Sequence, residues 1–97
     1  MILNWHLYLV RCNDRSLYTG ITTDVTRRFA EHQENKDPGA KYLRGRGPLA
    51  LVFQKKLGSR SLALSVESKI KKMSKVRKEE LVRDSAHIDE IIRQTGA

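Results

Sequence analysis

Five side chains have types and spacings that suit one kind of chemistry. Two tyrosines, Tyr8 and Tyr18, lie in short apolar runs, and Arg28 and His32 follow them four residues apart. A single glutamate, Glu67, comes later in the chain and is followed by lysines. Aromatic hydroxyls, a cation, an imidazole and a carboxylate that can bind a metal ion are groups suited to the hydrolysis of a phosphodiester.

A pair of adjacent strands is needed to bring the two tyrosines together. Segments 5–12 and 17–22 are rich in aromatic and branched residues, and the polar turn at 13–16 between them predicts a β-hairpin. With Cys12 opposite Tyr18, both tyrosines lie on one face, whereas a shift by one residue would separate them. In that register one face carries Tyr8, Val10, Tyr18 and Gly20, and the other carries Leu7, Leu9, Leu17 and Ile21.

A helix is predicted to carry the arginine and the histidine. Thr23 or Asp24 can cap this helix, which we expect to run to about Asn35. Because Arg28 and His32 are four residues apart, they project from neighbouring turns on the same side. The glycines and prolines that follow predict a loop over residues 37–48.

The second half of the chain predicts one strand followed by helices. Residues 49–57 form the expected third strand, and Ser59 or Ser61 can cap a helix that carries Glu67 at the edge of its apolar stripe. A further helix is expected over 74–83, and a last short one is expected to begin at Ser85.

These elements, in the order β-β-α-β-α-α, predict a small α+β fold. We expect a three-stranded antiparallel sheet flanked by helices. Residues 1–97 are expected to form a single domain, with a core from about 5 to 81 and a helical extension over about 82–97.

The composition predicts a soluble globular protein with a polyanionic partner. The chain has 97 residues, of which 39% are hydrophobic and 31% charged, as expected for one small domain. Its 19 Lys+Arg against 11 Asp+Glu give a formal charge of +8, which favours contacts with phosphates. One cysteine excludes an internal disulfide. No signal peptide or apolar stretch of membrane length is visible, so we expect a cytoplasmic protein without a membrane partner.

Together these positions resemble the GIY-YIG nuclease domain, a family named for two short tyrosine motifs. His6-Leu7-Tyr8 stands at the first motif and Tyr18-Thr19-Gly20 at the second, and the resemblance extends from about residue 5 to 81. Segments 40–46 and 67–74 are similar to the small bacterial members of the YhbQ type. The first motif lacks its name-giving Gly-Ile, and Ile21 stands where some members have a lysine. The asparagine that some members carry near the end of the domain has no match.

The resemblance implies a role for each matched residue. Tyr18 would activate the attacking water or act as the nucleophile, and Tyr8 would help to position that water or the scissile phosphate. Arg28 would contact the phosphate. His32 occupies a position that the family fills with histidine or tyrosine, and Glu67 would bind one divalent metal ion.

The physical chemistry of these residues agrees with such roles. A free tyrosine has a pKa of about 10, so a nearby cation or metal ion must stabilise the phenolate. Arg28 suits the planar contact with a charged phosphoryl group. A lone glutamate fits Mg²⁺ or Mn²⁺ that keeps several of its waters. Zinc is not expected, because one cysteine and three histidines form no cluster with ligand spacing.

Two basic segments are predicted to hold the nucleic acid. The lysines after Glu67 adjoin the expected metal ligand, which favours contact with the DNA backbone over a merely solvated face. The loop at 37–48 offers charge and an aromatic ring for stacking, and a flexible connector is the alternative interpretation. The predicted binding residues are Lys41, Tyr42, Arg44, Arg46, Lys69, Lys71 and Lys72.

The sequence therefore predicts a metal-dependent nuclease that acts on DNA in repair or recombination. It would recognise the shape of ends or junctions, or act with a protein partner that supplies targeting, and endonuclease and exonuclease cleavage are both compatible. One alternative is a non-catalytic nucleic-acid-binding module that retains the fold. Another is a basic protein associated with RNA or the ribosome. In the simplest interpretation, the tyrosines are half-buried strand residues and Glu67 is a surface ion-pair partner.

Overall fold

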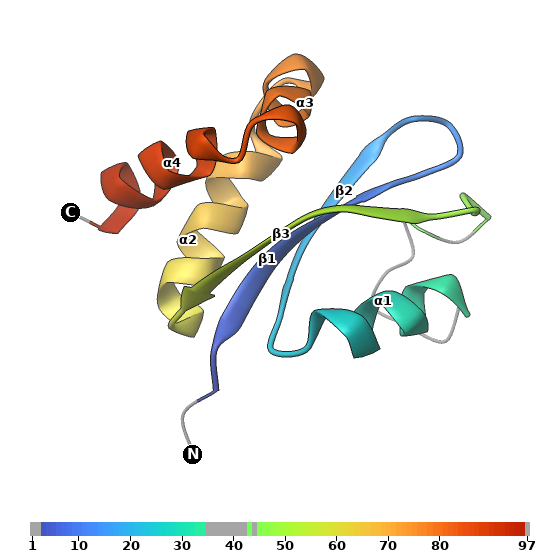
Figure 1. Ribbon diagram of the computed structural model, residues 1–97, viewed down its shortest axis with the longest axis horizontal. Coiled ribbons are helices and arrows are strands. Elements are labelled where there is room, and N and C mark those ends of the chain that lie inside the picture. Colours follow the sequence, from blue (N-terminus) through green and yellow to red (C-terminus); the bar gives the residue numbers. More distant parts are fainter. Residues whose placement is uncertain (1–2, 35–42, 44, 97) are drawn as a thin grey trace.

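A three-stranded antiparallel sheet lies at the centre of the molecule (Figure 1). The structure is a computed structural model that describes residues 3–34, 43 and 45–96. Strand β1 is Trp5–Arg11, β2 is Leu17–Thr22 and β3 is Ala50–Gly58. Their order in the sheet is β2-β1-β3, so β1 is central and β2 is an edge strand. This arrangement confirms the predicted sheet.

The described residues contain four helices. Helix α1 is Val25–Gln33, α2 is Arg60–Lys71, α3 is Lys75–Arg83 and α4 is Ala86–Gly96. The predicted order β-β-α-β-α-α left the last helix in the helical extension, where it was expected to be short and to begin at Ser85; it is a regular helix of 11 residues. Its apolar side is buried in the core through Ile88 and Ile91. None of these four helices is both long and apolar enough to span a membrane.

Local capping explains where three of the helices begin. The side chains of Asp24, Ser59 and Ser74 each accept a hydrogen bond from the backbone N–H three residues later. Such bonds satisfy donors that the first turn of a helix leaves without partners. Among the predicted alternatives, Asp24 is therefore the cap of α1 and Ser59 the cap of α2.

The hairpin register differs from the prediction by two residues. Val10, rather than Cys12, lies opposite Tyr18. The hydrogen bonds of the turn explain the difference. The Cys12 N–H donates to the Ser16 carbonyl, and the Arg15 N–H donates to the Cys12 carbonyl. Cys12 is therefore bonded to Ser16 across the turn and does not lie opposite Tyr18. Because side chains alternate with a period of two, a shift of two leaves every residue on its predicted face.

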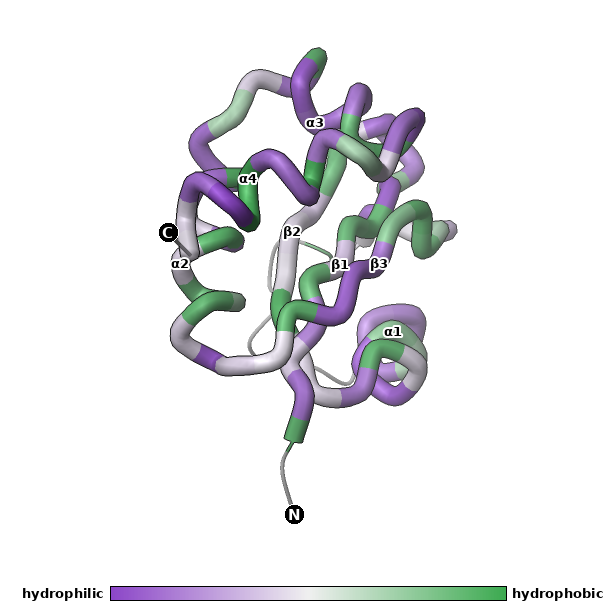
Figure 2. Tube along the Cα trace, turned by 60° about the vertical axis from the view of Figure 1, so that its left-hand side comes forward, coloured by the Kyte–Doolittle hydropathy of each residue, from purple (hydrophilic) through white to green (hydrophobic). Residues whose placement is uncertain are grey.

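The helices cover both faces of the sheet. Helix α1 packs on the face that carries Tyr8 and Val10, where Val25 and Phe29 contact them. The opposite face, with Leu7 and Leu9, forms the larger core with α2, α3 and α4. Figure 2 shows α2 and α4 on one side of the strands and α1 on the other. The two predicted groups of catalytic residues, on α1 and on α2, thus start from opposite sides of the sheet.

A bidentate ion pair fastens α3 to the central strand. The Arg11 guanidinium donates two hydrogen bonds of 2.7 Å to the carboxylate of Glu79. These bonds hold the pKa of the Glu79 carboxyl below its ordinary value and raise the pKa of Arg11. Paired N–H···O bonds of this kind constrain orientation as well as distance, so the pair orients α3 against the sheet.

Replacing Glu79 with glutamine should destabilise the fold in a pH-dependent way. Because the folded-state pKa of Glu79 is lowered, its stabilising contribution is present above the unfolded value of about 4.3 and is lost as the pH falls through the folded value. We expect Glu79→Gln to lower the free energy of unfolding by about 1 kcal/mol at neutral pH, and by much less in strong acid. Urea titrations at both pH values, with Glu80→Gln as the control, measure this. An equal loss at both pH values would contradict the prediction.

Candidate active site

The buried centre of the site is a contact between Tyr8 and His32. The hydroxyl oxygen of Tyr8 lies 2.8 Å from Nε2 of His32, within hydrogen-bonding distance. The side chains come from β1 and α1, and only 1% of Tyr8 and 2% of His32 is exposed. A hydrogen bond between groups so far from solvent fixes both rings, because neither can exchange its partner for water.

Gly20 makes the position of Tyr8 sterically possible. It lies directly opposite Tyr8 in the hairpin. A Cβ atom added to Gly20 would lie 2.5 Å from the Tyr8 hydroxyl oxygen and 2.6 Å from Cζ. The phenol ring therefore extends across the bare backbone of Gly20 toward α1, an approach that only glycine permits.

Tyr18 completes a group of three rings on the same face of the sheet. Its ring centroid is 6.4 Å from that of Tyr8 and 5.6 Å from that of His32, which it meets nearly edge-on at 76°. Unlike Tyr8, Tyr18 is only half-buried and lines a surface depression. The structure thus brings together three of the five predicted catalytic residues, and Tyr18 is the tyrosine that is open to solvent.

Arg28 lies on the same helix as His32, one turn closer to its N-terminus. Its Nη1 atom is 3.7 Å from Oε1 of Glu31, and the Arg27 Nη1 atom is 3.5 Å from the same oxygen. With 27% of its side chain exposed, Arg28 is more enclosed than Arg27, which has 59% exposed. Arg28, the residue predicted to contact the phosphate, therefore lies on the helix that carries the buried histidine, and its side chain is less exposed than that of the neighbouring Arg27.

Glu67 is joined to this site around the edge of the sheet rather than through it. Its Oε2 atom is 3.5 Å from Nζ of Lys71, one turn later on α2. Lys71 in turn lines the depression beside Tyr18, which we name the Tyr18 hollow and which has a volume of about 260 Å³. The hollow is lined by Leu17, Tyr18, Thr19, Lys71 and Lys78. Because β2 is an edge strand, residues from both faces reach this hollow.

The donor atoms near Glu67 restrict which metal ion could bind there. In the described part of the chain, no three His, Cys, Asp or Glu residues are grouped so that they could hold a metal ion. The Glu67 side chain is 17% exposed, so its carboxylate is accessible. A single accessible carboxylate fits a hard ion that keeps most of its waters, such as Mg²⁺, and does not fit zinc.

The predicted nucleic-acid-binding residues have different surroundings. Lys69, Lys71 and Lys72 are exposed at the C-terminal end of α2. The Arg46 guanidinium pairs with the Asp14 carboxylate, and the Arg46 carbonyl accepts a hydrogen bond from the Asn13 N–H, so this residue attaches the segment before β3 to the hairpin turn. The others, Lys41, Tyr42 and Arg44, lie outside the described residues.

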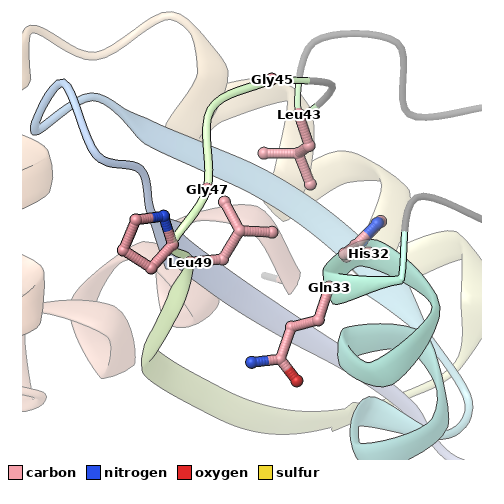
Figure 3. Close-up of a pocket in the computed structure, with 7 residues that line it drawn as sticks. His32, Gln33, Leu43, Gly45, Gly47 and Leu49 are labelled. Carbon is pink, nitrogen blue, oxygen red and sulfur yellow. The ribbon is translucent and has the colours of Figure 1, made fainter.

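Sequence reasoning missed a second depression, beside His32. It has a volume of about 280 Å³ and lies between the end of α1 and the segment before β3. In Figure 3 the side chains of Leu43 and Leu49 extend into the space between these segments, with Gln33 opposite. Leu43 is buried together with Cys12. An apolar leucine within a glycine- and arginine-rich stretch was the feature of the sequence that could have predicted this packing. Lys78 of the Tyr18 hollow belongs to the basic run after Glu67 that was predicted to contact the DNA backbone, but it was not among the predicted site residues.

Comparison with known proteins identifies the family. The profile of the GIY-YIG catalytic domain matches residues 4–80. The chain therefore belongs to the GIY-YIG family, a nuclease family whose substrates are nucleic acids, as its two tyrosine motifs predicted.

Its relatives are small bacterial proteins of the UPF0213 group. A UPF0213 protein of Cronobacter sakazakii is 62% identical over 78 residues, which is 80% of each chain. The UPF0213 protein YhbQ of Escherichia coli K12 is 52% identical over 88 residues, covering 91% of this chain and 86% of that one. These matches confirm the resemblance to the YhbQ type.

Two solved structures share the fold. The solution NMR structure of the UPF0213 protein BH0048 from Bacillus halodurans has a TM-score of 0.54 and 45% identity, and covers 82% of this chain and 83% of its own. That of EF2693 from E. faecalis has a TM-score of 0.59 and 33% identity, with 91% and 93% covered. The α+β architecture is thus common to relatives from different bacteria.

Replacing Gly20 with alanine should displace Tyr8. The added methyl group overlaps the phenol ring and its hydroxyl, so we expect a loss of about 1–3 kcal/mol in the free energy of unfolding. Urea unfolding measures the loss. Gly47→Ala is the control, since a Cβ atom at Gly47 meets nothing within 4 Å.

A double-mutant cycle isolates the contact itself. In a Tyr8→Ala background the ring is absent, and Gly20→Ala should then be nearly neutral. An equally large loss in that background would show that the glycine is needed for another reason.

Proposed function

We propose that this protein is a metal-dependent nuclease that hydrolyses phosphodiester bonds in DNA. The observation that carries the proposal is the group of three rings in which the Tyr8 hydroxyl is bonded to His32 while Tyr18 beside them stays open to solvent. Buried ionisable groups held in fixed positions beside an accessible hydroxyl are the arrangement expected of acid–base chemistry rather than of packing alone.

The two tyrosines would have different tasks. Tyr18 is accessible, so it would take the proton of the attacking water as the water oxygen attacks phosphorus and the bond from phosphorus to the leaving oxygen breaks. Lys71 and Lys78, which line the same hollow, carry positive charge that would stabilise the Tyr18 phenolate. Tyr8, enclosed and hydrogen-bonded to His32, would hold the reacting groups in place.

The charges of the phosphate and of the leaving group need separate partners. Arg28, on the helix that carries His32, would contact the non-bridging oxygens of the phosphate. Glu67 would hold one Mg²⁺ or Mn²⁺ ion, which supplies Lewis-acid stabilisation of the departing oxygen. The ammonium group of Lys71, 3.5 Å from Glu67, would give way or turn toward the DNA when the ion binds.

The substrate would be recognised by its shape. The accessible groups of the site lie at the open edge of β2, where a DNA end, nick or junction could reach Tyr18. Such a substrate would suit a role in repair or recombination, alone or with a protein partner that supplies targeting. Cleavage from ends and cleavage within strands are both compatible with this position.

Cleavage assays on DNA of defined shape test the proposal. Labelled single-stranded, duplex, nicked and branched DNA would be incubated with Mg²⁺, Mn²⁺ or EDTA. We expect metal-dependent products from the wild type and rates at least about 100-fold lower for Tyr18→Phe and for Glu67→Gln. Glu90→Gln, a change of an exposed carboxylate on α4, should leave the rate unchanged.

The same experiment tests the alternative function. The pairing of Glu67 with Lys71 favours a non-catalytic binding module, because an ammonium group already neutralises the only acidic residue proposed as a metal ligand. Binding without cleavage by all four proteins would establish that alternative and overturn the nuclease. Cleavage of RNA but not DNA would change the substrate while keeping the chemistry.

A further inference from the structure

Lysines from two different helices line the Tyr18 hollow. Lys71 reaches it from α2 and Lys78 from α3, while β2 supplies the remaining lining residues. Neither aspartate nor glutamate is among the lining residues. The Lys71 ammonium group is paired with Glu67 beside the hollow. The charge of Lys78 therefore does more to favour an anion there.

Lys78 has no acidic partner among the described residues. The neighbouring carboxylate, Glu79, is occupied by its two hydrogen bonds to Arg11, on the side of α3 that faces the sheet. Lys78 is nevertheless only half exposed, so part of its side chain has given up contact with water. A partly enclosed ammonium group without a counter-charge is stabilised when an anion binds beside it.

A buried hydroxyl at the same hollow also lacks a partner. Thr19 is 3% exposed, and its Oγ1 atom makes no hydrogen bond with any described residue. Buried hydroxyl groups nearly always have partners, and each exception calls for an explanation. Because Thr19 lines the hollow, an oxygen bound there is a candidate acceptor for this hydroxyl. Lys78 and Thr19, on different elements, thus point independently to one ligand chemistry.

We propose that the Tyr18 hollow binds a second phosphate group of the nucleic acid, next along the strand from the phosphate that reacts at Tyr18. Lys78 and Lys71 supply the charge, and the Thr19 hydroxyl supplies a directional hydrogen bond. Tyr18 forms one wall of the hollow, so a strand placed for reaction leads directly into it. The proposal rests on the proposed function, because it takes the phosphate at Tyr18 as its starting point.

The bound phosphate has two sources with the same chemistry. It is either an internal phosphodiester of a continuing strand or the terminal phosphate of a strand that ends in the hollow. An internal phosphate would fix the strand in register for cleavage at any position. A terminal phosphate would measure the distance from an end and make the protein act there.

Binding measurements in EDTA test the site without requiring cleavage. Fluorescence anisotropy would follow a short labelled duplex, with and without a terminal phosphate, over a series of salt concentrations. For Lys78→Gln we expect weaker binding and a decrease of about 0.9 in the slope of log K against log salt, which corresponds to one lost phosphate contact. Thr19→Val should weaken binding with little change in the slope.

Lys56→Gln is the matched control, with the same loss of charge on an exposed lysine of β3, at the other edge of the sheet. Weakening with both duplexes assigns the hollow to an internal phosphate, and weakening only with the phosphorylated duplex assigns it to a strand end. Equal effects of Lys78→Gln and Lys56→Gln would overturn the proposal for the hollow while leaving the nuclease intact. A wild-type protein that binds no DNA would overturn the proposed function itself.

Discussion

The rest of the site depends on the packing of one phenol ring across one glycine. Tyr8 stands on the central strand, passes over the bare backbone of Gly20 on the edge strand and ends at His32 on α1. A single side chain therefore sets the spacing of three elements. The same spacing positions Tyr18 beside the rings of Tyr8 and His32. Tyr18 is paired with Val10, which lies on the same strand as Tyr8. In a well-packed interior such a contact cannot shift without moving its neighbours.

The enclosed and the accessible halves of the site have different physical demands. Tyr8 and His32 are shielded from water, so their hydrogen bond is strong and their geometry rigid. In the proposed nuclease, Tyr18 and Glu67 would meet a solvated polyanion, and they lie on elements at opposite faces of the sheet. The edge position of β2 allows both arrangements in one site. Side chains from both faces of the sheet can reach the Tyr18 hollow around this edge strand.

The sequence predicted the features that depend on local patterns. The alternation of side chains along a strand predicted that Tyr8 and Tyr18 share one face, and capping residues such as Ser59 predicted where helices begin. Both patterns depend only on residues close together in the sequence. The predicted hairpin register was wrong by two residues. The length of the turn sets the register, and that length depends on hydrogen bonds between Cys12 and Ser16 that the sequence does not specify. Lys78 was part of the basic run predicted to contact DNA, but its position beside Tyr18 could not be predicted, because only the packing of α3 brings it beside β2.

The open edge of β2 also limits how this fold can be enlarged. An edge strand leaves backbone groups that can pair with a further strand. A strand added beside β2 would cover Tyr18 and close the hollow, whereas one added beside β3 would leave both exposed. A strand from an insertion or a fused segment can therefore extend the sheet at β3 without covering the site, but not at β2.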